Sequence, residues 1–247
     1  MLGMIRLRTS EDGPRARTIR TEAFGSTPFM TLVLQTRGME ALADRLLVRQ
    51  GVRWLAARGV KAAAAPDNRY INAQLARYHM ERLAHFPLMR CMAGQILDRL
   101  LCRRPDAAVL LYARAISRDV LDAAWHAARH YRMVMLDFGA FGETVRRRLM
   151  DEMGAPVLLG QVACGAPRAA ALLFDPPPPG FRVRLHGATT VALCPGAAPF
   201  ADFNGVRIEP GPFEPLGDTD REAVLAAVAS NNPKALGALS IGEFIKK

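Results

Sequence analysis

The sequence predicts an α/β protein built on a doubly wound, mostly parallel sheet. Three observations predict it. Short, continuous apolar runs alternate with helical segments of about three turns, and several of these helices carry start or stop signals. The chain has 247 residues, of which 50% are hydrophobic, so it can bury a large core. The regular alternation covers residues 59–175, between an N-terminal extension and an irregular Pro-rich C-terminal segment.

Residues 1–58 are expected to form a β-hairpin and a helix packed on the main domain. The stretches "MIRLRT" and "RARTIRTEAF" fit two strands joined by the turn residues of "SEDGP". The run "FMTLVLQ" fits either a strand or the start of a helix capped by Ser26 or Thr27. The next helix, which ends near Gly59, has one apolar face formed by Met39, Leu42, Leu46 and Leu47.

Residues 59–175 are expected to form the core, with six strands. These are "GVKAAAA", "HMERLA", "AAVLLYA", "RMVMLDF", "APVLLG" and "RAAALLFD". The expected helices are "DNRYINAQLARY", "PLMRCMAGQILDRLLC", "SRDVLDAAWHAARHY" and "GETVRRRLMDEM". Pro87 at a first helical turn, Ser117 at an N-cap and Gly154 after a last turn mark their boundaries. The alternation resembles Rossmann-like folds, which implies a ligand site where the carboxyl ends of the strands meet helix N-termini.

Residues 176–247 are expected to combine a hairpin, an irregular surface segment and C-terminal helices. Four consecutive prolines at 176–179 exclude a helix or a central strand. The stretch "FRVRLHGATTVALC" fits a hairpin that turns at His186–Gly187, and "GVRIE" fits a strand. "DTDREAVLAAVASN" fits a helix that starts at Asp218 or Thr219, and "PKALGALSIGEFIKK" fits a weaker one.

The charge and the cysteines of the chain bear on the cellular compartment that we expect for it. The net charge is +10 and comes almost wholly from arginine, as in proteins of GC-rich bacterial genomes, and the surplus lies in the first two thirds of the chain. No apolar run reaches the roughly 18 residues of a membrane helix, and no secretory signal is apparent. We therefore expect a cytoplasmic protein with no membrane contact and with reduced thiols. The four cysteines, Cys91, Cys102, Cys164 and Cys194, form no CxxC pair.

The turn in "MLDFGAFGETVRRRL" is the main candidate site. When this stretch is aligned with the dinucleotide fingerprint G-x-G-x-x-G, it reads D-F-G-A-F-G, so Asp137 stands where the first glycine is needed. Gln161 stands where an acid for a ribose hydroxyl is expected. If a nucleotide or small phosphorylated ligand binds here, its contacts are Asp137, Gly139, Gly142 and Thr144. The alternative is that the glycines only let the chain turn and the helix pack closely on the sheet.

Other side chains supply weaker candidates. Further residues expected at strand ends are Asp67, Asn68, His85, Arg114, Cys164 and Asp175. His126 and His130 lie four apart on one helix, as metal ligands can, but no third ligand accompanies them and we predict no metal. Cys164 and Cys194 lie in loops without a paired base. No nucleophile elbow or Walker A loop is present in the sequence, and it assigns no cofactor.

Three functions remain open, in this order. The altered fingerprint and the lack of a paired acid and base favour a non-enzymatic interaction or regulatory module with an unknown protein partner. The second is binding of a nucleotide or small phosphorylated ligand at the carboxyl edge of the sheet, with or without catalysis. The third is nucleic-acid binding through basic segments. These segments are Arg146–Arg148, Arg103–Arg104 and the N-terminal Arg6, Arg8, Arg15, Arg17 and Arg20.

Overall fold

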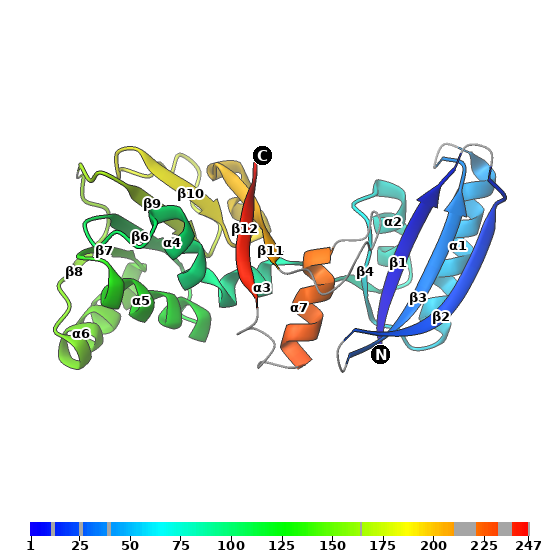
Figure 1. Cartoon of the computed structure of the whole chain (residues 1–247), viewed down its shortest axis with the longest axis horizontal. Coiled ribbons are helices and arrows are strands. Elements are labelled where there is room, and N and C mark those ends of the chain that lie inside the picture. Colours follow the sequence, from blue (N-terminus) through cyan, green and yellow to red (C-terminus); the bar gives the residue numbers. More distant parts are fainter. Residues whose placement is uncertain are drawn as a thin grey trace. The chain divides into compact units, whose positions relative to one another are not determined.

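The computed structural model describes residues 1–10, 13–24, 27–38, 41–163, 165–209, 221–231 and 239–246. The chain divides into two compact units, each with its own sheet (Figure 1). Unit 1 contains Met1–His85 and Pro210–Leu239, and unit 2 contains Phe86–Glu209 and Ser240–Lys247. This division differs from the expected boundary at residues 58 and 59, because residues 59–85 belong to unit 1.

The sheet of unit 1 has the strand order β2-β3-β1-β4-β5. Its strands are β1 (Leu2–Thr9), β2 (Ala16–Phe24), β3 (Thr27–Thr36), β4 (Ala62–Ala64) and β5 (Glu81–Arg82). β1 pairs in parallel with β3 and β4, and β2 pairs antiparallel with β3. The predicted hairpin of the first two strands is therefore wrong, since the hairpin is formed by β2 and β3. Met4 and Ile5 of β1 are fully buried, so β1 takes a central place, whereas the polar β2 suits an edge.

The strand pairing of unit 1 also places the boundary between the units after His85, not between residues 58 and 59. "GVKAAAA" and "HMERLA" were expected to begin the sheet of the core. The strands that they form, β4 and β5, instead extend the sheet of β1. Helix α1 (Leu42–Ala57) connects β3 to β4, and α2 (Arg69–Arg77) connects β4 to β5. Helix α7 (Arg221–Asn231) packs on β3 and β4. Asn68 caps α2 by accepting from the backbone N–H of Tyr70 at 2.9 Å.

Helix α1 buries a different face from the predicted one. Leu42 and Leu46 are 73% and 46% exposed, and Met39 lies outside the described residues. The buried face consists of Asp44, Val48, Gly51, Val52 and Leu55. A Cβ on Gly51 would lie 2.6 Å from Cδ2 of Leu32, so glycine lets the helix approach β3 closely. Arg15 Nε donates to the buried Asp44 carboxylate at 2.9 Å, which makes burial of this acid tolerable.

The sheet of unit 2 has the strand order β12-β11-β10-β9-β6-β7-β8. Its strands are β6 (Ala108–Tyr112), β7 (Met133–Asp137), β8 (Val157–Leu159), β9 (Ala169–Leu173), β10 (Ala188–Ala192), β11 (Phe203–Glu209) and β12 (Ser240–Lys246). All pairs are parallel except β11 with β12. Counted from β6, the order is 3-2-1-4-5-6 with an antiparallel seventh strand at the edge. This is the doubly wound Rossmann order, and it confirms the predicted fold class.

Helices cover one face of this sheet. They are α3 (Phe86–Cys91), α4 (Ala93–Leu101), α5 (Arg118–His130) and α6 (Gly142–Met153). Helices α4, α5 and α6 pack side by side (Figure 1). On the other face, Leu185 and the partly buried Val183 pack on Ala108, Leu110 and Met135. Two short 3-10 helices, η1 (Gly139–Phe141) and η2 (Pro195–Phe200), follow β7 and β10.

Two C-terminal predictions are wrong. In the stretch expected to turn at His186–Gly187, only the second half is a strand, and that strand, β10, runs parallel to β9. The first half instead covers the sheet, with Leu185 buried. The segment predicted as a weak terminal helix forms β12, which pairs antiparallel with β11. The helix over 221–231 is confirmed, and its expected start at Asp218 or Thr219 lies outside the described residues. None of the described helices combines the length and apolar character that a membrane crossing requires.

Candidate functional site

The carboxyl edge of the unit 2 sheet, between β6 and β9, is the candidate site. Both strands are buried throughout, and they pair along their whole length. After β6 the chain winds toward β7, and after β9 it winds toward β10 on the other side. At such a switch point the two outgoing loops diverge, and Rossmann sheets bind their ligands in the crevice between them.

Asp175 connects the two loops at this point. It follows β9 and is half-buried. Its Oδ2 accepts from the backbone N–H of Arg114 at 2.7 Å and of Ala115 at 3.1 Å. These two amides follow the first strand of the Rossmann order, where a fingerprint loop presents its amides to a pyrophosphate. The loop here, "YARAIS", contains no glycine, and a carboxylate of the protein itself takes the place of an anion.

Arg90 of α3 fixes the N-terminus of α5 beside this loop. Its Nη2 donates to Oγ of Ser117 at 3.0 Å, and its Nη1 donates to the carbonyl of Phe174 at 3.0 Å. Its Nε pairs with Asp119 in the first turn of α5. Burial opposes ionisation of Asp119, but hydrogen bonds from Arg90 and Ser117 outweigh it and hold the pKa of this acid below its ordinary value. Ser117 stands at the predicted N-cap position, yet its side chain makes no capping hydrogen bond.

Aromatic and apolar groups pack around the same edge. The rings of Tyr112 and Phe181 lie 4.8 Å apart, and the hydroxyl of Tyr112 accepts from Arg114 Nε at 3.1 Å. Burial, assisted by the charge of Asp175, raises the pKa of the Cys194 thiol. Burial also raises the pKa of Cys91. Since the thiolate is the reactive form, neither environment activates a nucleophile. Cys164 lies outside the described residues.

The structure places the predicted turn after β7, the second strand of the Rossmann order. Gly139 has φ +53 and opens the 3-10 turn, and a Cβ on Gly142 would lie 3.1 Å from Cδ2 of Leu159. Thr144 is exposed on α6. The turn therefore does not occupy the fingerprint position, which follows the first strand. Whether Asp137, Gly139, Gly142 and Thr144 contact a ligand stays a prediction.

The strand order places Asp137 at a different position of the Rossmann pattern. The acid that binds a ribose hydroxyl in Rossmann domains lies about 20 residues beyond the first turn, and Asp137 ends the strand next to β6. In the alignment to the glycine pattern, Asp137 stands at the position of a glycine and Gln161 at the position of the acid. In the structure Gln161 Nε2 donates to Asp137 at 3.1 Å, and Gln161 Oε1 accepts from the backbone N–H of Arg184 at 2.8 Å.

His126 belongs to a hydrogen-bonded cluster on α4 and α5, away from the switch point. Its Nε2 lies 2.8 Å from Asp98 Oδ1, which also accepts from the hydroxyl of Tyr131 at 2.9 Å. Arg103 Nε donates to Asp98 Oδ2 at 3.1 Å, and the ring of His130 lies 4.5 Å from that of His126. Partial burial opposes ionisation of Asp98, but these hydrogen bonds hold its pKa below the ordinary value. Burial and the bond to Asp98 raise the pKa of Tyr131.

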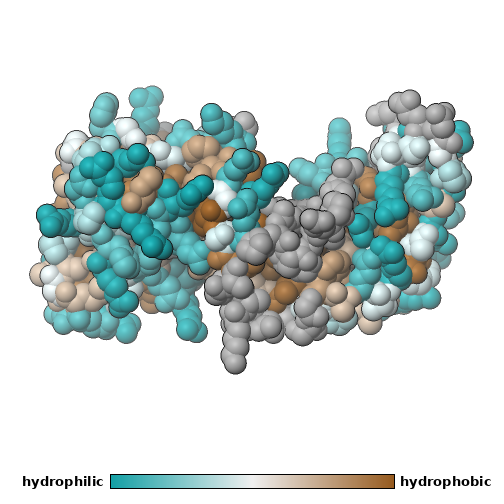
Figure 2. Space-filling view, viewed as in Figure 1, coloured by the Kyte–Doolittle hydropathy of each residue, from teal (hydrophilic) through white to brown (hydrophobic). Residues whose placement is uncertain are grey.

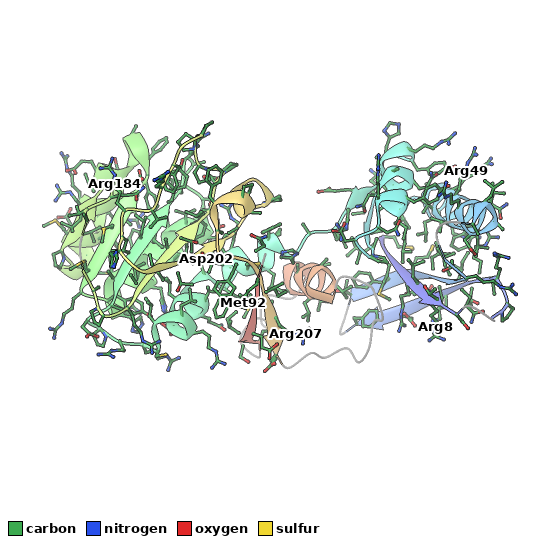
Figure 3. The ribbon with its side chains drawn as sticks, turned by 90° about the horizontal axis from the view of Figure 1, so that it is seen from above. Arg8, Arg49, Met92, Arg184, Asp202 and Arg207 are labelled. Atoms are coloured by element: carbon green, nitrogen blue, oxygen red, sulfur yellow. The ribbon has the colours of Figure 1, made fainter. Side chains whose placement is uncertain are left out.

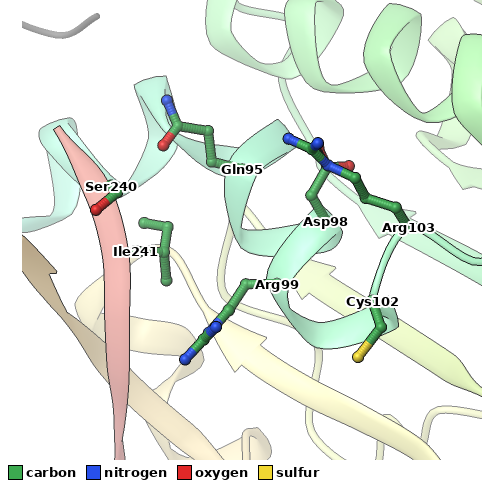
Figure 4. A pocket seen from close by; sticks show the side chains of 7 residues that line it. All are labelled: Gln95, Asp98, Arg99, Cys102, Arg103, Ser240 and Ile241. Carbon is green, nitrogen blue, oxygen red and sulfur yellow. The ribbon is translucent and has the colours of Figure 1, made fainter. Parts of the chain in front are cut away.

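A shallow groove of about 420 Å³ adjoins this cluster (Figure 4). It is lined by Gln95, Asp98, Arg99, Cys102, Arg103, Ser240 and Ile241. Within the part of the chain that the structure describes, no group of three or more His, Cys, Asp or Glu side chains is arranged to hold a metal ion. We interpret the histidines as part of the packing of α4 on α5.

Most arginines of the predicted basic segments form ion pairs with acids of the same unit, and two acids, Glu143 and Glu22, each pair with two arginines. On α6, Arg146 and Arg147 pair with Glu143 at 2.7 and 2.8 Å, and their hydrogen bonds lower the pKa of Glu143 to about 2. Arg148 pairs with Glu152 at 2.7 Å. The other ion pairs are Arg103–Asp98, Arg104–Asp106, Arg6–Glu22, Arg20–Glu22 and Arg15–Asp44. Arg8 and Arg49 remain exposed in unit 1 (Figure 3).

Sequence reasoning identified Asp175 and Arg114 as strand-end residues but missed Arg90, Tyr112 and Phe181. Arg90 precedes the first strand of unit 2, so no strand-end rule applies to it. Asp67, Asn68 and His85, which were expected on the same sheet, belong to unit 1.

No family model matches this sequence, and no curated protein matches it significantly. Three solved structures show a distant similarity. A candidate aspartate carbamoyltransferase from Trypanosoma cruzi is 10% identical, with 78% of this chain and 69% of that chain covered and a TM-score of 0.30. L-tryptophan dehydrogenase from Nostoc punctiforme is 8% identical, with 78% and 62% covered and a TM-score of 0.31. A shikimate 5-dehydrogenase-like protein is 9% identical, with 66% of each chain covered and a TM-score of 0.27. At these scores the similarity carries no argument about function.

Proposed function

We propose that this protein is a non-enzymatic interaction or regulatory module, in which a Rossmann-like domain fills its own anion position at the switch point. The observation that carries the proposal is the pair of hydrogen bonds from the amides of Arg114 and Ala115 to Asp175, at 2.7 and 3.1 Å. Hydrogen bonds to a charged group contribute about 1.5–3 kcal/mol each. A phosphate that took these amides would have to displace both bonds and meet the carboxylate at close range.

The surroundings of Asp175 support the same proposal. The guanidinium group of Arg90 is committed to Ser117, Asp119 and the Phe174 carbonyl, so it is not free to clamp a phosphate. The thiol of Cys194 has a raised pKa and gives no nucleophile. The arrangement holds α3, α5 and the two loops together, which suits a rigid surface for a partner.

The test compares binding of ADP and inorganic phosphate by the wild type and by Asp175→Ala, measured by isothermal titration calorimetry. We expect no heat of binding for the wild type at millimolar ligand, and a gain of anion binding in the variant, because its two amides are released. Asp202→Ala is the matched control. Asp202 also accepts from a backbone N–H, that of Thr190 at 2.8 Å, but does so beside β10 and β11. Wild-type binding that Asp175→Ala abolishes would contradict the proposal.

A second candidate function is binding of a nucleotide or small phosphorylated ligand, and Asp137 is the observation that favours it. Its carboxylate ends the second strand, the place where Rossmann domains bind a ribose hydroxyl. A nucleotide held there should bind more tightly when its ribose carries a 2′-hydroxyl. We expect a melting-temperature shift with ADP-ribose that Asp137→Ala and Gly142→Val remove. Asp122→Ala, which changes a 73% exposed carboxylate on α5, is the control. No shift at millimolar ligand across a nucleotide panel would exclude this function.

A further inference from the structure

The exposed side of two helices in unit 1 carries five arginines. Helices α1 and α2 pack side by side, and both bury apolar residues against the unit 1 sheet (Figure 3). On α1, Arg45, Arg49 and Arg53 are exposed, and because they follow one another at intervals of four residues they form one stripe along the helix. Arg69 and Arg77 are exposed on α2. We call these five side chains the α1–α2 arginine face.

The two helices expose no acid. Their only acidic residue is Asp44, which is buried and pairs with Arg15. Asp67, just before α2, pairs with Arg82 at 3.0 Å. Within the part of the chain that the structure describes, four members of the face take part in no ion pair: Arg49, Arg53, Arg69 and Arg77. The positive charge of the face is therefore not balanced by carboxylates on its own helices.

The arginine-rich helix of unit 2 differs in this respect. On α6, Glu143 and Glu152 pair with all three arginines of the helix. Like charges four residues apart destabilise a helix, and α1 contains two such pairs without an exposed acid. On the opposite side of unit 1, over the strands, hydrophilic and apolar residues are mixed (Figure 2). The helical side of unit 1 is thus a surface with one sign of charge, which fits a polyanion.

We propose that the α1–α2 arginine face binds the phosphate backbone of a nucleic-acid duplex. A guanidinium group can donate two parallel hydrogen bonds to one phosphate, and it stays charged at physiological pH. On each strand a duplex presents a phosphate for about every 3.4 Å of its axis, and the arginines of α1 are about 6 Å apart along theirs, so each can reach a separate phosphate. The proposal goes beyond the proposed function and does not depend on it, because the switch point belongs to unit 2.

The aromatic residues of the two helices favour a duplex over a single strand. Single strands bind by stacking their bases on aromatic side chains. The hydroxyl of Tyr70 donates to the carbonyl of Arg45 at 3.0 Å, and the guanidinium of Arg45 lies 6.0 Å from the centre of the same ring. The guanidinium of Arg58 lies 3.3 Å from the ring centre of Trp54. Both rings already contact arginines, so the face offers guanidinium groups to a nucleic acid, and we expect binding without sequence preference.

The test is fluorescence anisotropy of a labelled DNA duplex of about 20 base pairs, titrated with the full chain at about 50 to 200 mM NaCl. The variant replaces four members of the face, Arg49, Arg53, Arg69 and Arg77, with glutamine. Glutamine has nearly the helix propensity of arginine, so the variant should stay folded, which circular dichroism checks. We expect at least about tenfold weaker binding at the lowest salt. The slope of log K against log[NaCl] should become shallower by about 3–4, since each lost phosphate contact removes about 0.9.

The matched control removes the same charge from unit 2. Four exposed arginines there each pair with an acid, and the control replaces them with glutamine: Arg104, Arg118, Arg147 and Arg148. Both variants lower the net charge of +10 by the same amount. The control should weaken binding by less than about threefold, because its arginines already pair with carboxylates.

Three outcomes would overturn the proposal. The first is a wild type that does not bind the duplex at a protein concentration of about 0.1 mM and low salt. The second is equal weakening by the variant and the control, which would assign binding to the net charge of the chain. The third is displacement of the duplex by polyglutamate at a lower concentration of charge than unlabelled duplex requires, which would assign the face to an acidic protein.

Discussion

Replacing Asp98 with alanine should destabilise unit 2 strongly, because its carboxylate, which is 14% exposed, hydrogen-bonds to the buried Tyr131 and the partly buried His126. Tyr131, which is 4% exposed, donates to Asp98 at 2.9 Å, and His126 Nε2 lies at 2.8 Å. A hydrogen bond to a charged group contributes about 1.5–3 kcal/mol. The third partner, Arg103, has a side chain that is 81% exposed and adds little. We therefore expect a loss of roughly 3–5 kcal/mol in the free energy of unfolding.

The assay is urea unfolding followed by tryptophan fluorescence. The sequence has two tryptophans. Trp54 lies in unit 1 and Trp125 on α5, so a Trp54→Phe background reports on unit 2 alone, which matters because two units need not unfold together. Asp98→Asn keeps the shape and an acceptor oxygen, so it should lose about half as much. A loss below about 1 kcal/mol in Asp98→Ala would refute the reasoning.

The pH dependence of the unfolding free energy is an independent test of the role of Asp98. The pKa of Asp98 is lowered in the folded protein, so its ionised form stabilises the fold above the unfolded pKa of about 3.9. This stabilisation is lost as the pH falls through the folded pKa. The difference in unfolding free energy between the wild type and Asp98→Asn should therefore be full at pH 5 and above and should shrink below pH 4. A difference that grows toward low pH would contradict the assignment.

Three further predictions concern packing and charge. Gly51→Ala places a Cβ 2.6 Å from Leu32, so overpacking of about 1–3 kcal/mol should exceed the helix-propensity gain of about 1 kcal/mol, measured by urea unfolding through Trp54. Leu172→Ala, in the fully buried β9, should lower the unfolding free energy of unit 2 by about 2–5 kcal/mol, reported by Trp125. Replacing Arg146–Arg148 together with their partners Glu143 and Glu152 by glutamine changes the net charge by only one unit, so it should leave the salt concentration of elution from heparin nearly unchanged. Markedly earlier elution would support nucleic-acid binding through this helix.

Local signals in the sequence predicted most elements of unit 2. The apolar runs at β6, β7 and β9 became buried strands, and the helices after β6 and β7 lie where Ser117 and Gly154 indicated. Such signals act over a few residues, so they identify a strand without its neighbours. Pairing of β1 with β4 is decided by burial of β1 on both faces. For that reason the division into units differs from the predicted one.

Prediction of the candidate site is limited in the same way, because its residues lie far apart in the sequence. The strand end at Asp175 could be identified from the sequence, but the residue that it binds lies about sixty positions earlier, at Arg114. The glycine pattern was aligned with the turn after β7, and Asp137 was compared with a glycine, because the sequence does not reveal which strand is first. A glycine-based alignment assumes that the first strand precedes the glycines, and here the second strand does.

The division of the chain constrains how the protein can be made and dissected. The polypeptide passes between the units three times, at residues 85–86, 209–210 and 239–240. A ribosome that has released residues 1–209 has supplied all of unit 2 except its antiparallel edge strand, while unit 1 still lacks α7. Neither unit can be excised by a single truncation, and one proteolytic cut at any crossing leaves both units covalently joined. Isolation of unit 2 therefore requires a circular permutation or a designed link from Glu209 to Ser240.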